Sequence, residues 1–129
     1  MGVMSQNLRV SIGICAFNEE KNIGRVIENL LNQPIRNHEL TEIIVIASGC
    51  TDKTANVVQT WCNRNGKVKL VVEPTRNGKT VAINKLLRTF KGDVLVHVSA
   101  DLFLSQDVLQ PLLDHFNDPS VGGVSGYQI

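Results

Sequence analysis

"LRVSIGICAFNEEKNIGRVIENLL" (residues 8–31) joins a run of apolar and β-branched residues directly to a segment whose apolar side chains recur at intervals of three and four. The run predicts a strand over residues 8–17. The segment after it predicts a helix that ends before Pro34, with Asn18 as N-cap and two glutamates in the first turn. A strand followed at once by a helix is the first half of a β-α-β crossover.

The same alternation continues along the chain. Further strands are predicted over residues 42–48, 68–73, 93–98 and, as a candidate, 121–126; further helices are predicted over 51–62, 80–90 and from about Asp107, with Pro111 in the first turn. Strands that read as near-continuous apolar runs indicate a parallel sheet covered on both faces. The sequence therefore predicts an α/β fold, a three-layer α/β/α Rossmann-like sandwich with a mostly parallel sheet flanked by helices.

Length and composition limit the function classes. The 129 residues show no repeat and no break in composition, which favours a single domain over residues 1–129. Thirteen basic and twelve acidic residues give a formal charge of +1 without a basic stripe, so nucleic acid is not an expected partner. Three cysteines without a C-x-x-C spacing favour a reducing compartment. With no signal-peptide pattern and no apolar run of about 18 residues, we expect a cytoplasmic protein.

Candidate functional residues follow the strands, because open parallel sheets bind ligands beyond the carboxyl ends of their strands. These positions read Phe17–Glu20, Ala47–Asp52, Glu73–Lys79 and Ser99–Asp101. The dinucleotide motif G-x-G-x-x-G is absent. The tripeptide GKT at 78–80 lacks the glycine that a phosphate-binding P-loop needs five residues earlier, which argues against an ATPase.

Five segments at these positions resemble, in order, the N-terminal nucleotide-binding half of family 2 glycosyltransferases. They are "VSIGICAFNEEKNI", "EIIVIASGCTDKT", "RNGKTVAINKLL", "GDVLVHVSADLFLSQDVLQPLL" and "VGGVSG". Together they cover essentially the whole chain. The resemblance implies the GT-A fold, a nucleotide diphosphate-sugar as partner and a divalent cation, Mg²⁺ or Mn²⁺, as cofactor. Such a cation stabilises the charge that develops on the departing phosphate.

The resemblance also assigns roles to residues. Asp101 aligns with the second aspartate of the family's D-x-D motif, which implies that it binds the metal, and Ser99 stands where the first aspartate typically contacts ribose. Arg76 and Lys79 match basic residues that meet the diphosphate.

The remaining candidates for substrate binding are Phe17, Asn18 and Glu19 after the first strand and Ser48 after the second. The family usually has two aspartates after the second strand, one of them for the base, where this chain has Ala47 and Ser48. The identity of the base therefore does not carry over from the family.

Each assignment has a structural alternative. Asn18 and Glu19 would serve the start of a helix in any case, Lys79 could be an ordinary solvated lysine, and Asp101 could be a turn residue. We interpret His97 as packed and hydrogen-bonded, Cys50 as a small turn residue rather than a nucleophile, and Trp61 as core. We expect the third helix to bury Ala82, Ile83, Leu86, Leu87 and Phe90.

The family needs a second half that binds the acceptor and supplies a general base for transfer with inversion, and we expect that base beyond Ile129. The fragment alone is then expected to transfer little or nothing. The apolar surface left by the missing half could drive self-association, and the full-length protein could be membrane-associated. The alternative hypothesis is a catalytically inactive GT-A-fold interaction or regulatory module, which the replacements at Ala47, Ser48 and Ser99 would favour.

Overall fold

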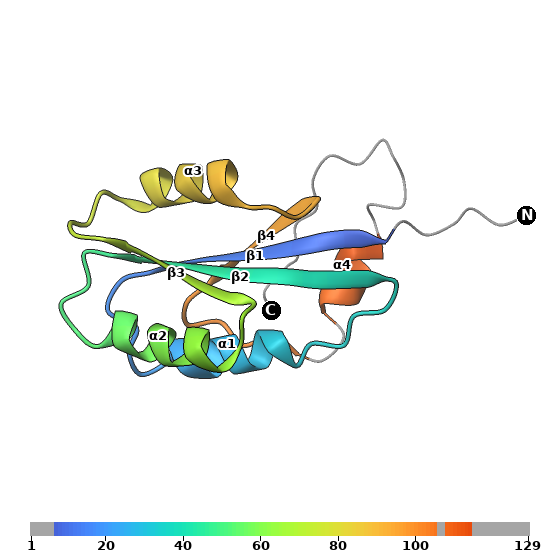
Figure 1. The fold of residues 1–129 in the computed structure, drawn as a ribbon, viewed down its shortest axis with the longest axis horizontal. Coiled ribbons are helices and arrows are strands. Elements are labelled where there is room, and N and C mark those ends of the chain that lie inside the picture. Colours follow the sequence, from blue (N-terminus) through green and yellow to red (C-terminus); the bar gives the residue numbers. More distant parts are fainter. Residues whose placement is uncertain (1–6, 106–107, 115–129) are drawn as a thin grey trace, which may run out of the picture.

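The computed structural model describes residues 7–105 and 108–114. Strands and helices alternate through this part of the chain, as Figure 1 shows. The elements are β1 (Leu8–Ala16), α1 (Ile23–Leu31), β2 (His38–Ser48), α2 (Thr54–Arg64), β3 (Val68–Glu73), α3 (Lys79–Thr89), β4 (Val94–Ser99) and α4 (Leu109–Asp114). Among the described residues, no helix is both long and apolar enough to cross a membrane.

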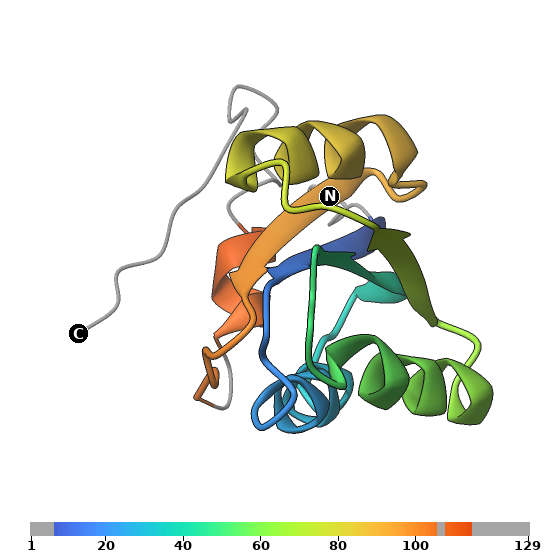
Figure 2. The same cartoon turned by 90° about the vertical axis from the view of Figure 1, so that its left-hand side faces the viewer.

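The four strands form one parallel sheet in the order β3-β2-β1-β4. The chain runs outward from β1 through β2 to β3 and then returns to the other side of β1 as β4 (Figure 2). The strand order therefore reverses between β1 and β4, which is where sheets of this type bind their ligands.

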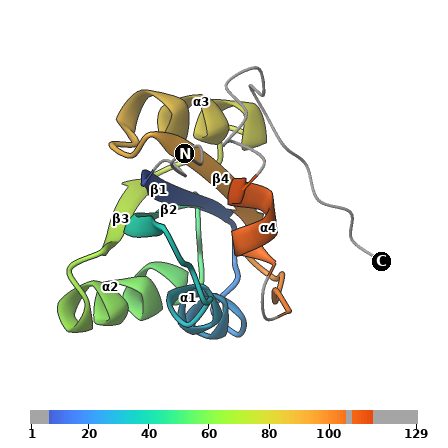
Figure 3. The ribbon, with the colours of Figure 1, turned by 90° about the vertical axis from the view of Figure 1, so that its right-hand side faces the viewer.

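Helices cover both faces of the sheet, so the predicted three-layer α/β fold is confirmed. In Figure 3, α1 and α2 lie below the sheet and α3 lies above it. The larger core lies on the side of α1 and α2 and includes Val10, Ile12, Ile14, Val26, Ile27, Leu30, Ile43, Val45, Val58, Leu109 and Leu113. The smaller core, under α3, contains Ile44, Ile46, Ala82 and Leu86. Successive residues of a strand point to opposite faces, and this alternation divides β1 and β2 between the two cores.

The predicted start of the first helix was wrong. Helix α1 begins at Ile23 with Asn22 as its N-cap, several residues later than the sequence pattern indicated. Asn18 has a φ of 51°, in the left-handed region that asparagine tolerates better than most residues, and it lies in the loop before the helix. Its side chain bonds the neighbouring loop instead of capping α1.

Three other expectations can be compared with the structure. Leu87 is 54% exposed rather than buried, because α3 turns its Ala82 and Leu86 toward the sheet. His97 is exposed on β4, so the prediction that it is packed was wrong. Trp61 packs partly buried against the larger core.

The predicted last helix is present as α4, with Pro111 in its first turn. The candidate strand over 121–126 lies outside the described residues.

A buried carboxylate ties three strands together near the amino ends of the sheet. Glu42 of β2 is 1% exposed and accepts hydrogen bonds from the Ser11 hydroxyl at 2.7 Å, the Lys69 ammonium at 2.9 Å and the Lys91 amide at 2.6 Å. Burial on its own would raise the pKa of Glu42, but these hydrogen bonds outweigh it and hold the pKa below its ordinary value.

This carboxylate makes an acid-dependent contribution to stability. A lowered folded-state pKa stabilises the fold above the ordinary value of 4.5, and the contribution is lost as the pH falls through the folded-state pKa. We expect the free energy of unfolding to decrease below about pH 4.5, and to decrease less steeply in Glu42→Gln. Urea unfolding at a series of pH values measures this, with exposed Glu39→Gln as control. Parallel pH profiles for Glu42→Gln and the wild type would contradict the assignment.

Candidate functional site

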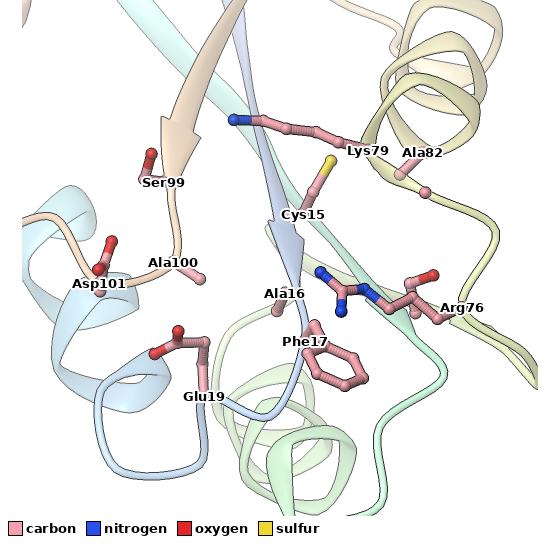
Figure 4. Close-up of a pocket in the computed structure, with 12 residues that line it drawn as sticks. Cys15, Ala16, Phe17, Glu19, Arg76, Lys79, Ala82, Ser99, Ala100 and Asp101 are labelled. Atoms are coloured by element: carbon pink, nitrogen blue, oxygen red, sulfur yellow. The ribbon is translucent and has the colours of Figure 1, made fainter.

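A pocket of about 340 Å³ lies at the carboxyl ends of the strands, where the strand order reverses (Figure 4). Of the eight residues predicted for substrate or metal, it is lined by seven: Phe17, Glu19, Ser48, Arg76, Lys79, Ser99 and Asp101. The predicted residue outside the lining is Asn18. Tertiary structure therefore gathers, around one cavity, side chains from four separate stretches of the chain, each at or just after the end of a strand.

Asn18 connects the loops that follow β1 and β2. Its Oδ1 accepts hydrogen bonds from the amides of Thr51 at 2.8 Å and Asp52 at 3.3 Å. The Asp52 carboxylate in turn accepts hydrogen bonds from the amides of Glu20 at 3.2 Å and Thr54 at 2.9 Å. These bonds hold the loop that carries Phe17 and Glu19 against the start of α2. Asn18 thus shapes the pocket wall from behind.

Gly49 allows the loop after β3 to approach the loop after β2. Its φ is 58°, and a Cβ atom added there would lie 2.9 Å from the Arg76 Cα and closer still to the Arg76 backbone nitrogen. Its amide donates a hydrogen bond to the Glu73 carbonyl at 2.9 Å. Only a residue without a side chain fits so close to another backbone, and this contact brings Arg76 to the pocket.

The basic side of the pocket consists of Arg76 and Lys79. The Arg76 guanidinium lies 4.0 Å from the centre of the Phe17 ring, within the range of a cation–π contact. Lys79 is the first residue of α3, and its side chain extends across the end of β1 beside Cys15 (Figure 4). The ion pairs among the described residues join other side chains, so both charges remain available to an anion.

The pKa values of Cys15 and His97, two groups close to Lys79, are shifted from their ordinary values. Burial raises the pKa of the Cys15 thiol, and the nearby Lys79 charge opposes that rise. Although the His97 side chain is largely exposed, desolvation by the residues around it and then the Lys79 charge lower its pKa. Both groups are therefore kept mainly uncharged at neutral pH.

The acidic side of the pocket lies opposite. Ser99 ends β4, Ala100 is buried and Asp101 is exposed. Figure 4 shows the Glu19 and Asp101 side chains on one side of the cavity, with Arg76 and Lys79 on the other. One side thus offers oxygen ligands and the other offers positive charge.

The donor set fits a divalent cation only in company with an anionic ligand. Within residues 7–105 and 108–114, no group of three or more His, Cys, Asp or Glu side chains could hold a metal alone. Mg²⁺ in phosphate-binding sites is typically held by one or two carboxylates plus phosphate oxygens and water. Asp101, with Glu19 nearby, supplies that number of carboxylates.

Cys15 lines the pocket although the sequence pattern did not single it out. It pairs in register with Ser99 of β4, so the two side chains share one face of the sheet. The sequence alone gives no signal for the position of Cys15 in the pocket, because that position depends on β4 lying beside β1. Cys50, interpreted from the sequence as a turn residue, contacts the Ala16 carbonyl and the Asn18 amide, each at 3.5 Å from its sulfur.

Comparison with known proteins finds similarity to sugar-transferring enzymes in both a family model and individual relatives. The sequence model of the family described as glycosyl transferase family 2 matches residues 11–128. An uncharacterized glycosyltransferase from Haemophilus influenzae is 31% identical over 105 residues, which make up 81% of this chain and 41% of that protein. A beta-monoglucosyldiacylglycerol synthase from Nostoc is 29% identical over 117 residues, 89% of this chain and 25% of that protein. The chain therefore spans less than half the length of these curated relatives.

A solved structure is similar over most of the same region. A mannosyltransferase from Pyrobaculum calidifontis, in complex with GDP-Man and Mn²⁺, superposes with a TM-score of 0.79 at 30% sequence identity. The superposition covers 90% of this chain and 34% of that one.

Proposed function

The chain belongs to glycosyltransferase family 2, and on that basis we propose that it is the donor-binding domain of an enzyme that transfers a sugar from a nucleotide diphosphate-sugar. The observation that carries the proposal is the division of charge across the pocket. A diphosphate placed in it would meet Arg76 and Lys79 on one side. A cation bound to its other oxygens would meet Asp101.

The other lining residues would bind the nucleoside. The Ser99 hydroxyl can hydrogen-bond a ribose hydroxyl, although without the charge of an aspartate. Phe17 offers an aromatic face beside Arg76, and Ser48 lies where the second strand ends. Ala47 and Ser48 are both buried and uncharged. We therefore expect selection of the base to differ from that of family members with aspartates at these positions.

A divalent cation would supply stabilisation of the charge that builds on the leaving diphosphate. The protein's part is to hold the diphosphate from the basic side and to orient Asp101 toward the cation. The similar mannosyltransferase was solved with GDP-Man and Mn²⁺, which supports Mn²⁺ and a nucleotide diphosphate-sugar as ligands to try first. We further propose that residues 1–129 form one donor domain. Acceptor binding, the general base and inversion at the transferred sugar would then depend on sequence outside this domain.

An inactive module with the same fold is the second candidate. The absence of paired aspartates at Ala47 and Ser48, together with Ser99 in the motif that ends in Asp101, favours it. The two candidates differ in whether the pocket binds a nucleotide through a metal.

Thermal unfolding with UDP-, GDP- and dTDP-sugars, each with and without Mn²⁺, separates these candidates. A ligand at 100 times its Kd stabilises the fold by about 2.7 kcal/mol, which such a measurement resolves. We expect a Mn²⁺-dependent rise in Tm with at least one donor. In Asp101→Asn, which keeps the side-chain shape and removes the charge, we expect that dependence to be lost.

Glu39→Gln is the matched control, because Glu39 is exposed near the opposite end of the sheet and should leave the rise in Tm intact. If no donor gives a Mn²⁺-dependent shift, metal-dependent binding of these donors is excluded. If Asp101→Asn shifts as the wild type does, Asp101 is not the residue that binds the metal.

A further inference from the structure

Two side chains on α1 and a third just beyond its C-terminal end contact three consecutive residues of the segment that follows Asp101. Arg25 and Asn29 lie four residues apart on one side of α1, and Gln33 follows after four more residues, just past the end of the helix at Leu31. In the same order they contact Phe103, Leu104 and Ser105. We call these three side chains the α1 row. A run of contacts in matching order holds the segment in one register against the helix.

The central member of the α1 row makes the most specific contact. The Asn29 amide donates a hydrogen bond from Nδ2 to the Leu104 carbonyl at 3.0 Å, and its Oδ1 accepts one from the Leu104 amide at 2.9 Å. One side chain thus satisfies both backbone groups of one loop residue, much as a neighbouring strand would. On either side, Gln33 donates to the Ser105 carbonyl at 2.9 Å, and the Arg25 guanidinium lies 5.0 Å from the centre of the Phe103 ring.

The backbone between the end of β4 and Leu104, which Asn29 holds, decides where Asp101 points. A turn with a hydrogen bond from the Leu102 amide to the Ser99 carbonyl, 3.2 Å long, follows the strand. Ala100 is buried in the larger core, and Leu102 and Leu104 pack partly buried against it. Asp101 itself is exposed, so the backbone between the strand and Leu104 sets its direction, rather than packing of its own side chain.

We propose that Asn29, with the rest of the α1 row, is a positioning residue that holds the Asp101 loop for metal-assisted binding of the nucleotide. This rests on the proposed function, in which Asp101 binds the cation. Asn29 lies on the outer side of the loop and is not among the residues that line the pocket, so it acts through the Leu104 backbone. Outer-shell partners of metal ligands typically change metal affinity by 10- to 100-fold when they are removed.

Titration of Mn²⁺ into the chain with GDP or UDP, followed by calorimetry, tests the proposal. We expect Asn29→Ala to weaken the apparent Mn²⁺ affinity about tenfold, with nucleotide binding in the absence of metal unchanged. Asn29→Asp keeps the acceptor for the Leu104 amide but loses the donor to the Leu104 carbonyl, and should lie between Ala and wild type. Amide hydrogen exchange should accelerate over residues 101–105 in Asn29→Ala. The control is Asn32→Ala, which removes the same group from the exposed end of α1.

The outcomes separate this inference from the proposed function. If Asp101→Asn abolishes the Mn²⁺ effect while Asn29→Ala stays within twofold of wild type, the positioning role is overturned and the proposed function stands. The positioning role is likewise overturned if Asn29→Ala lowers Tm but weakens nucleotide binding equally with and without Mn²⁺, because that is a purely structural loss. If the wild type shows no Mn²⁺-dependent binding at all, both proposals fall together.

Discussion

Gly49→Ala is expected to lower the free energy of unfolding by about 2–4 kcal/mol and to abolish nucleotide binding. The added methyl group would lie 2.9 Å from the Arg76 Cα and closer still to the Arg76 nitrogen, and these are backbone atoms that no rotamer change can move. A φ of 58° adds strain for any residue with a side chain. Relief of the clash requires the loop after β3 to move away, which carries Arg76 off the Phe17 ring and out of the pocket.

Gly66→Ala is the control for this prediction, because nothing lies within 4 Å of a Cβ atom there. Urea unfolding gives the stability of both variants, and calorimetry with GDP or UDP gives the affinity. A Gly49→Ala variant that binds nucleotide as tightly as Gly66→Ala would show that the approach of the two loops does not position Arg76.

Leu86→Ala is expected to cost about 2–5 kcal/mol, a large part of the stability of a small domain. Leu86 is fully buried and holds α3 against β1, where a Cβ atom on Gly13 would lie 2.7 Å from its Cδ1. Loss of this contact loosens the helix whose first residue is Lys79. Donor affinity should therefore fall together with stability, as urea unfolding and calorimetry would measure.

A double-mutant cycle with Gly13→Ala makes this prediction specific. Alone, Gly13→Ala adds a methyl group to a filled space and should destabilise the fold by about 1–3 kcal/mol. Combined with Leu86→Ala, the new methyl occupies part of the space that leucine leaves, so the double variant should be more stable than the sum of the two losses predicts. Additive losses would mean that the two residues do not share one packing site.

The order and type of the elements could be predicted because their signals are local. Apolar runs in β1 to β4 and the three-and-four spacing in α1 identified strands and helices whose bounds agree with the structure within a few residues at most ends. The start of α1 was missed because the N-cap pattern at Asn18 is equally compatible with a turn. The deciding contact, with Thr51, joins residues 33 apart in the sequence.

The residues of the candidate site could also be predicted from the sequence only in part. Position after a strand marked two segments that hold Arg76, Lys79, Ser99 and Asp101. The family resemblance singled out these four residues, and all four line the cavity. The contact of Arg76 with Phe17 and the clamp of Asn29 on Leu104 could not be predicted, since the clamp alone spans 75 residues of sequence. Exposure of His97 also depends on which side chains cover β4, and this is a property of the assembled sheet.

By itself, the sequence determined that this protein is an alternating α/β sandwich with polar residues after its strands, because hydrophobic periodicity and strand ends are encoded over a few residues. Only the tertiary structure decided that β4 lies beside β1, and hence that Ser99 faces Cys15 and that Asp101 stands across one pocket from Arg76 and Lys79. The physical reason is that strand order and loop contacts depend on burial and hydrogen bonds between distant segments, which form only when the sheet is assembled.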